Sequence, residues 1–319
     1  MDAFIVMLKN VIVFVALAIP GYLLVRTKKI KKEQSGALSV LLMYVGMPFL
    51  IFSSTVNKVV FNKDLLLTIA VVLGIGVLYT VATFFASKPL TAMEREEKTR
   101  GMMRFASVFS NNGFLGIPLA MAVFAHDSMA LMVVIILNIV TNVLMYTLGI
   151  YLISGDKKTM SFKKAFLNPV LIAFLVGTVA NLLKVKSFVP EIETFSTHFS
   201  NIVTPVSMTI LGMKMGDVKF SKLFTSSKTY YVSALKLVVF PVVIVSVALL
   251  LKGVFPIVVT SDMVLGIFIA FAMPTAGLAS TFSDSFNGDT ENAVAFTLGT
   301  TILSIITIPL LYLAVCCLI

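Results

Sequence analysis

Ten long apolar segments fill this chain from end to end, and they constrain its fold more than any other feature. A helix needs roughly 20 apolar residues to cross a bilayer, and a helix satisfies its own backbone hydrogen bonds in lipid. The segments have about this length, so we predict an all-α polytopic membrane protein with ten transmembrane helices. They lie near residues 3–25, 35–56, 64–86, 102–124, 129–153, 165–184, 193–213, 229–251, 263–283 and 292–318.

The composition excludes an ordinary soluble enzyme. Hydrophobic residues make up 58% of the 319 residues and charged residues 13%, whereas soluble domains average about 45–50% and about 25%. The two cysteines are adjacent, at Cys316 and Cys317, so they form neither a disulfide framework nor a zinc site. We therefore interpret residues 1–319 as a single membrane domain that needs no cofactor or metal.

The net charge of +10 comes from basic clusters between the apolar segments, which is the pattern that orients membrane helices and not one that indicates nucleic-acid binding. Of the 25 Lys and Arg residues, 18 lie in or beside the odd-numbered loops, five in the even-numbered loops and two inside segments. This asymmetry predicts a multi-pass protein of the cell membrane, with odd-numbered loops in the cytoplasm and both termini outside. The first segment is followed by its basic cluster, so it is interpreted as a retained helix and not a cleaved signal peptide.

Prolines at matched positions indicate two related halves of opposite orientation. Pro48 and Pro118 are 70 residues apart in the first half, and Pro205 and Pro274 are 69 residues apart in the second. With five spans in each half, the second half would begin on the side of the membrane opposite to the first, which is the condition for an inverted repeat. We predict repeats at 1–155 and 160–319, each with a proline break in its second and fourth helices.

The fourth and ninth segments carry helix-breaking residues at their centres. Asn, Gly and Pro are poor helix formers, and two carboxamides at bilayer depth are costly unless they face protein, water or a ligand. Broken helices at corresponding positions of two inverted halves indicate a transport site, and the N-termini of the half-helices favour an anion. The alternative is that the prolines only kink packed helices. The candidate substrate-binding residues at the two breaks are Asn111, Asn112, Gly113, Gly116, Pro118, Pro274, Thr275 and Ala276.

Three further polar residues inside segments are candidates for the same site. Asn138 and Asn142 lie four residues apart and hence on one helical face, although they equally suit hydrogen bonds to a neighbouring helix. Lys236 would attract an anionic substrate, unless its side chain extends to the membrane interface.

Other polar residues have ordinary structural interpretations. Lys214 ends the seventh segment and is interpreted as a topology anchor, and hydroxyls such as Ser207 and Thr209 usually bond a carbonyl of their own helix. His126 and His198 have no neighbours at metal-ligand spacing. No nucleophile–base pair is visible in the sequence, so we do not expect an enzyme.

The motif Ser-Asn-Asn-Gly-Phe-Leu-Gly-Ile-Pro-Leu at 110–119 resembles the fourth-helix signature of the auxin efflux carrier family, which includes plant PIN carriers and bacterial malate-permease-like proteins. Ala-Met-Pro-Thr-Ala at 272–276 resembles its ninth-helix counterpart, and further similarity lies at 212–215, 235–237 and 303–310. The resemblance implies an inverted-repeat carrier in which helices 4 and 9 cross beside the substrate. It also implies a scaffold of helices 1, 2, 6 and 7, through which two copies could pair, and a transport unit of helices 3–5 and 8–10.

The long hydrophilic loop of canal-type plant carriers is absent, because the fifth loop has only about ten residues. A bacterial-type carrier of organic anions therefore fits better than an auxin carrier. Malate, malonate, other carboxylates and auxin-like acids all remain open as substrates.

The membrane potential drives an anion outward, with about 2.3 kcal/mol per charge per 100 mV. No acidic residue lies deep inside a segment, so we expect uncoupled efflux or exchange of small organic anions by alternating access. The alternatives are a sodium-coupled organic-anion symporter of the bile-acid type and a metabolite sensor that does not transport.

Overall fold

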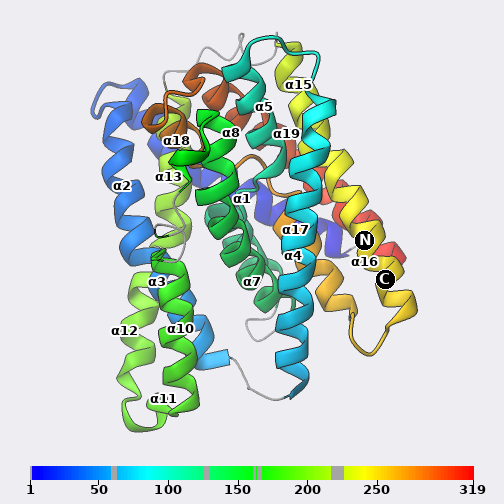
Figure 1. Ribbon diagram of the computed structural model, residues 1–319. Coiled ribbons are helices and arrows are strands. Elements are labelled where there is room, and N and C mark those ends of the chain that lie inside the picture. Colours follow the sequence, from blue (N-terminus) through cyan, green and yellow to red (C-terminus); the bar gives the residue numbers. More distant parts are fainter. Residues whose placement is uncertain (1, 59–62, 125–128, 161–162, 164–166, 217–225) are drawn as a thin grey trace.

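The computed structural model of the chain consists of helices (Figure 1), and it describes residues 2–58, 63–124, 129–160, 163, 167–216 and 226–319. Within these residues no strand is formed, and one isolated antiparallel bridge joins Ser110 and Thr275. Each of the ten predicted segments contains helix. His126 lies outside the described residues.

In the first half, several segments consist of two helices joined by a wider π-helical turn. The helices are α1 (Asp2–Arg26), α2 (Ser35–Leu41), α3 (Met47–Lys58), α4 (Lys63–Leu90), α5 (Glu97–Val108), α6 (Ile117–Val123), α7 (Met129–Leu144) and α8 (Ile150–Ser154). The π-helical turns are Leu42–Gly46 between α2 and α3, Asn112–Gly116 before α6, and Met145–Gly149 between α7 and α8.

The second half also contains segments that consist of two helices. Its helices are α10 (Pro169–Leu182), α11 (Val185–Phe188), α12 (Glu191–Ser200), α13 (Val203–Met215), α15 (Ser227–Ala234), α16 (Phe240–Val254), α17 (Ser261–Ala272), α18 (Ala279–Ser285) and α19 (Thr290–Leu318). A π-helical turn, Leu235–Val239, joins α15 to α16.

Five continuous helical stretches in the described residues are long and apolar enough to cross a membrane, which makes this a multi-pass membrane protein. They are Lys32–Val56, Leu66–Leu90, Met129–Ser154, Ser227–Val254 and Thr290–Leu318. The fourth and ninth predicted segments give shorter apolar helices, Asn112–Val123 and Ser261–Ala272, because each segment is interrupted near its middle.

Three prolines stand two residues after the end of a π-helical turn: Pro48, Pro118 and Pro241. A proline has no N–H, and its ring clashes with the carbonyl four residues earlier, so the preceding turn often widens. At Pro48 the helix therefore bends and continues, where the sequence predicted a break. In the seventh segment the interruption lies at Asn201–Ile202, between α12 and α13, and Pro205 belongs to the first turn of α13.

Two glycines bring α1 and α13 into close contact. A Cβ atom built on Gly21 would lie 2.0 Å from the Thr209 carbonyl oxygen, and one built on Gly212 would lie 1.8 Å from the Ala18 carbonyl oxygen. Only glycine allows the two backbones to approach this closely, as is common where helices pack in membranes.

The remaining packing surrounds the broken segments. α10 and α12 pack on α3, and α17 packs between α7 and α16. In Figure 1 the α4–α5 connection and the start of α15 lie at the upper end, whereas α11 and the α16–α17 connection lie toward the lower end. The described parts of these two odd-numbered and two even-numbered loops thus lie at opposite ends.

Candidate functional site

The two interrupted helices meet at their breaks. The chain is extended after α5 and again after α17, and the two extended pieces pair in antiparallel fashion. The Asn111 N–H donates to the Pro274 carbonyl at 2.7 Å, and the Ala276 N–H donates to the Phe109 carbonyl at 2.9 Å. Each break therefore satisfies backbone groups that the other leaves without a helical partner, as a buried backbone requires.

Thr275 holds this crossing together and is not part of the wall of the pocket described below. Its N–H donates to the Thr300 hydroxyl at 3.1 Å, and its own hydroxyl donates to the Ala106 carbonyl at 2.9 Å. The side chain is fully buried. Its role in the structure is to hold the ninth-segment break against α5 and α19.

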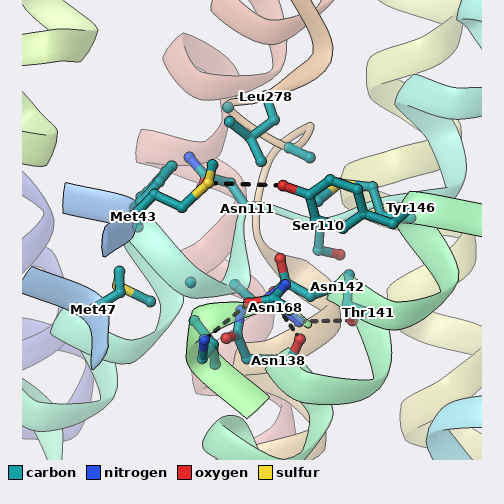
Figure 2. A pocket seen from close by; sticks show the side chains of 17 residues that line it. Met43, Met47, Ser110, Asn111, Asn138, Thr141, Asn142, Tyr146, Asn168 and Leu278 are labelled. Carbon is teal, nitrogen blue, oxygen red and sulfur yellow. Dashed lines mark hydrogen bonds between the residues drawn. The ribbon is translucent and has the colours of Figure 1, made fainter. Parts of the chain in front are cut away.

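A pocket lies beside the crossing (Figure 2). Its empty space, including the part open to solvent, is about 500 Å³. The side chains that line it are uncharged in the part of the chain that the structure describes. They comprise five carboxamides (Asn111, Asn112, Asn138, Asn142 and Asn168), together with hydroxyl, sulfur, aromatic and aliphatic groups that include Thr141, Met43, Met47 and Tyr146.

Three of these carboxamides and a threonine form one hydrogen-bonded network. The Asn138 Nδ2 donates to Asn112 Oδ1 at 3.0 Å, and the Asn112 Nδ2 donates to Thr141 Oγ1 at 2.9 Å. The Asn142 Nδ2 donates to the Asn138 carbonyl at 2.8 Å. A Cβ atom at Gly113 would lie 2.8 Å from the Asn138 Nδ2, so glycine at 113 leaves room for the network.

The first residues of a helix also line this pocket. The first amides to bond inside the helix 112–123 are those of Leu115 and Gly116, which both donate to the Asn111 carbonyl. The preceding amides belong to 112–114, three residues that line the pocket. Such first-turn amides and the helix dipole favour a negative charge.

The second predicted helix N-terminus is arranged differently. The Ala276 amide is taken by the Phe109 carbonyl, and α18 begins only at Ala279. Of the two half-helices expected to offer an N-terminus to an anion, only the one that begins at 112 has its first residues in the described pocket wall.

The structure brings together about half of the residues predicted for the site. Gly116, Pro118, Pro274 and Thr275 lie in the broken segments but are not part of the pocket wall. The residues that do line it are Asn111, Asn112, Gly113, Asn138, Asn142 and Ala276.

Lys236 lies behind the pocket wall. Its amine donates to Ser110 Oγ at 2.5 Å, and the side chain is fully buried. The alternative that Lys236 extends to the membrane interface is therefore wrong, because the π-helical turn 235–239 directs it into the crossing.

Two residues of α13 reach the broken segments in a way that the sequence did not indicate. The Ser207 hydroxyl donates to the Phe114 carbonyl at 3.1 Å, as well as to Thr204 of its own helix. The Lys214 ammonium donates to the Gly277 carbonyl at 2.9 Å and to the Ser280 hydroxyl at 3.4 Å. The only sequence signal was their spacing of seven residues, which places both on one helical face. Thr209 bonds the Pro205 carbonyl of its own helix, as expected.

Asn168 and Tyr146 are pocket residues that the sequence also left unassigned. The Asn168 side chain caps α10 by accepting from the Val170 N–H at 2.9 Å, and the Tyr146 hydroxyl donates to the Met43 sulfur at 3.7 Å. An Asn before a proline is a recognisable helix-start signal; it gave no indication of the pocket.

Comparison with known proteins identifies the family of the chain. A family described as membrane transport protein matches residues 5–312. An uncharacterized transporter of Methanothermobacter thermautotrophicus is 26% identical over 309 residues, which cover 95% of this chain and 96% of that protein. The chain therefore belongs to the membrane transport protein family, the auxin efflux carrier family that its motifs resemble.

Proposed function

We propose that this secondary transporter carries small organic anions, and that the substrate carboxylate binds at the start of the helix 112–123. The observation that carries the proposal is the pocket, whose wall includes the first residues of this helix and five carboxamides, and no charged side chain among the described residues. A helix N-terminus stabilises a nearby anion by about 0.3–1 kcal/mol, and by up to about 2 kcal/mol when partly buried. Carboxamide N–H groups add further donors.

The walls of the pocket support alternating access. Met43, Met47 and Asn168 belong to the second and sixth segments, which the family resemblance assigns to a scaffold. The opposite wall, at 110–114, 138–146 and 276–278, belongs to the fourth, fifth and ninth segments of the proposed transport unit. Movement of one group against the other would open the pocket first to one side and then to the other, in a ten-helix inverted repeat.

The charges favour outward movement of an anion without a coupling ion. No Asp or Glu is part of the described pocket wall, so no carboxylate there is available to carry a proton. The membrane potential alone supplies about 2.3 kcal/mol per charge per 100 mV for anion efflux.

Efflux of labelled organic acids from proteoliposomes tests this function. The panel contains mono- and dicarboxylates, each measured with and without a potassium–valinomycin potential, for the native protein, Asn112→Ala and Asn201→Ala. Asn201 is the matched control, because it is exposed in the α12–α13 connection.

We expect saturable efflux of an acid that the potential accelerates, that Asn112→Ala abolishes and that Asn201→Ala leaves intact. Flux in Asn112→Ala equal to that of the native protein would show that the substrate does not bind at this site. Flux that requires an imposed sodium gradient at zero potential would instead support the bile-acid type of symporter, and binding without flux would support a sensor.

A further inference from the structure

The connection between α1 and α2 carries a dense group of positive charges. Of the seven residues 26–32, which we call the cationic loop, five are basic and none is acidic. Glu33 follows the loop, is exposed and forms no ion pair among the described residues. The exposed cations are Arg26, Lys28, Lys29 and Lys31, and Lys32 is partly buried.

A tight turn holds these cations together at the end of α1. The Lys28 N–H donates to the Val25 carbonyl at 2.9 Å, and the Lys29 N–H donates to the Leu24 carbonyl at 3.0 Å. This is the Schellman pattern of a helix C-terminus, and Lys28, with a φ of 58°, takes the left-handed conformation in which glycine is usual there. Because backbone donors satisfy these carbonyls, the lysine side chains are not needed to cap the helix.

The helices on both sides of the cationic loop present apolar side chains to their surroundings. Leu23 and Leu24 in the last turn of α1 are exposed, as are Val40 and Leu41 in α2. Exposed apolar residues beside a polar rim are typical of a surface that meets a membrane. In Figure 1 the loop lies at the upper end, where the predicted orientation places the cytoplasm.

Other basic side chains near the upper end are bonded to the protein itself. The Lys98 Nζ donates to Asn287 Oδ1 at 3.0 Å, and Lys228 forms an ion pair with Glu94. In the part of the chain that the structure describes, no hydrogen bond or ion pair engages the side chains of the four exposed cations of the loop. Their charge is therefore available to an external anion.

The connection from α8 to α10 is also basic, but its surroundings differ. Lys157 and Lys158 follow Asp156, whose carboxylate accepts from the Lys158 N–H at 2.8 Å. Leu152 and Ile153, in the turn before this connection, are buried. That turn therefore packs on protein, whereas the last turn of α1 offers an apolar surface to lipid.

We propose that the cationic loop binds the headgroup of an anionic phospholipid, whose acyl chains lie along the exposed apolar residues of α1 and α2. Clusters of four or more basic residues directly after a transmembrane helix attract anionic lipids, and each residue strengthens binding about fivefold. The first two segments belong to the scaffold that the family resemblance implies, so the lipid would hold this scaffold at the membrane surface. The inference does not depend on the transported substrate.

Native mass spectrometry tests the lipid preference. The protein is released from micelles that contain equal amounts of dioleoyl-phosphatidylglycerol and dioleoyl-phosphatidylcholine, which share their acyl chains and differ in headgroup charge. One triple variant removes three charges of the loop, and a second keeps them by replacing the same three lysines with arginine. The matched control removes three exposed lysines of the α8–α10 connection. The charge-removing substitutions are Lys28→Gln, Lys29→Gln and Lys31→Gln in the loop, and Lys157→Gln, Lys158→Gln and Lys163→Gln in the control.

We expect the native protein to retain phosphatidylglycerol over phosphatidylcholine by about tenfold. This ratio should fall below about twofold when the three loop charges are removed, because most of the electrostatic attraction is lost. The arginine variant and the control should keep the native ratio.

Hydrogen exchange of the native protein locates the lipid without any substitution. The amides of 27–35 should exchange more slowly in phosphatidylglycerol nanodiscs than in phosphatidylcholine nanodiscs. The amides of 156–160 should exchange equally in both. This measurement decides the question if the variant of the loop does not fold.

Four results overturn the inference. One is equal retention of the two lipids by the native protein, and another is the same loss of preference in the control, which would indicate attraction by net charge alone. The third is equal exchange of 27–35 in the two kinds of nanodisc. The fourth is displacement of phosphatidylglycerol by inorganic phosphate, which would indicate a site for a free anion. None of these results bears on the proposed transport site.

Discussion

Ser110 and Thr275 face each other where the two broken helices cross, and each is held by a residue from a different helix. The Lys236 amine donates to the Ser110 hydroxyl, and the Thr300 hydroxyl accepts from the Thr275 N–H. Several polar groups released by the two breaks are thus bonded to each other and to neighbouring side chains. This explains how non-helical backbone is tolerated in the interior of a membrane protein, where each unsatisfied group would be costly.

Replacing Thr300 by Val should destabilise the crossing. The substitution removes the acceptor of the buried Thr275 N–H, and an unsatisfied buried donor costs about 1–3 kcal/mol. We expect a lower unfolding temperature for the purified protein in detergent. The control is Thr301→Val, because the Thr301 hydroxyl bonds only the Thr297 carbonyl of its own helix. Equal destabilisation by the two substitutions would contradict this account.

Replacing Gly212 by Ala should separate α1 from α13. The added methyl group would lie 1.8 Å from the Ala18 carbonyl oxygen, and overpacking of this kind typically costs about 1–3 kcal/mol. The yield of folded protein after size-exclusion chromatography and its unfolding temperature measure the effect. Gly253→Ala is the control, since no heavy atom lies within 4 Å of its Cβ position. A native-like Gly212→Ala protein would show that the close approach of the two helices is dispensable.

The ion pair between Glu94 and Lys228 should make stability depend on pH. Their Oε2 and Nζ atoms are 2.5 Å apart, and the hydrogen bond from Lys228, followed by that from the Glu96 N–H, holds the pKa of Glu94 below its ordinary value. Because the folded pKa is the lower one, this stabilisation is present above the unfolded pKa and is lost as pH falls through the folded pKa.

Lys228→Gln should therefore lower the unfolding temperature at pH 7 and have little effect at a pH below the lowered folded pKa of Glu94, where the carboxyl is protonated in both states. Lys157→Gln, at an exposed lysine, should have no effect at either pH. A Lys228→Gln effect of the same size at both values would mean that the pair does not act through the Glu94 charge.

The sequence was sufficient to predict the helical segments and the interruptions of the fourth and ninth segments. Apolar segments of about 20 residues have few alternatives to helix in lipid, and Asn111, Gly113 and Pro274 lie where the fourth and ninth helices are interrupted. The break in the seventh segment was placed at Pro205, yet it lies at Asn201–Ile202. Proline is tolerated in the first helical turn, so its presence alone did not locate the interruption.

The roles of the two lysines could not be predicted, for a physical reason. Lys236 bonds Ser110, 126 residues away along the chain, and Lys214 bonds Gly277, 63 residues away. Periodicity and spacing report the neighbours of a residue on its own helix, whereas these contacts depend on how separate helices pack. Asn138 and Asn142 could be identified as pocket residues because their spacing of four residues places both on one helix face.

Thr141 should be needed for transport although no charge changes when it is replaced. Its Oγ1 accepts the hydrogen bond from the Asn112 Nδ2 at 2.9 Å, and Asn112 in turn accepts from Asn138. Thr141→Val keeps the shape of the side chain and leaves the Asn112 Nδ2 without this acceptor, so the carboxamide loses its fixed orientation beside the helix N-terminus. We expect a loss of about tenfold in the efflux rate at limiting substrate, equivalent to about 1.4 kcal/mol.

The matched control is Thr147→Val, farther along the same segment. Its hydroxyl bonds the carbonyls of Val143 and Leu144 in its own helix, and Thr147 is not part of the described pocket wall. Because both substitutions make the same chemical change in a buried helix, a general effect on folding would appear in both. Native efflux in Thr141→Val, or equal losses in the two variants, would show that the orientation of Asn112 does not determine substrate binding.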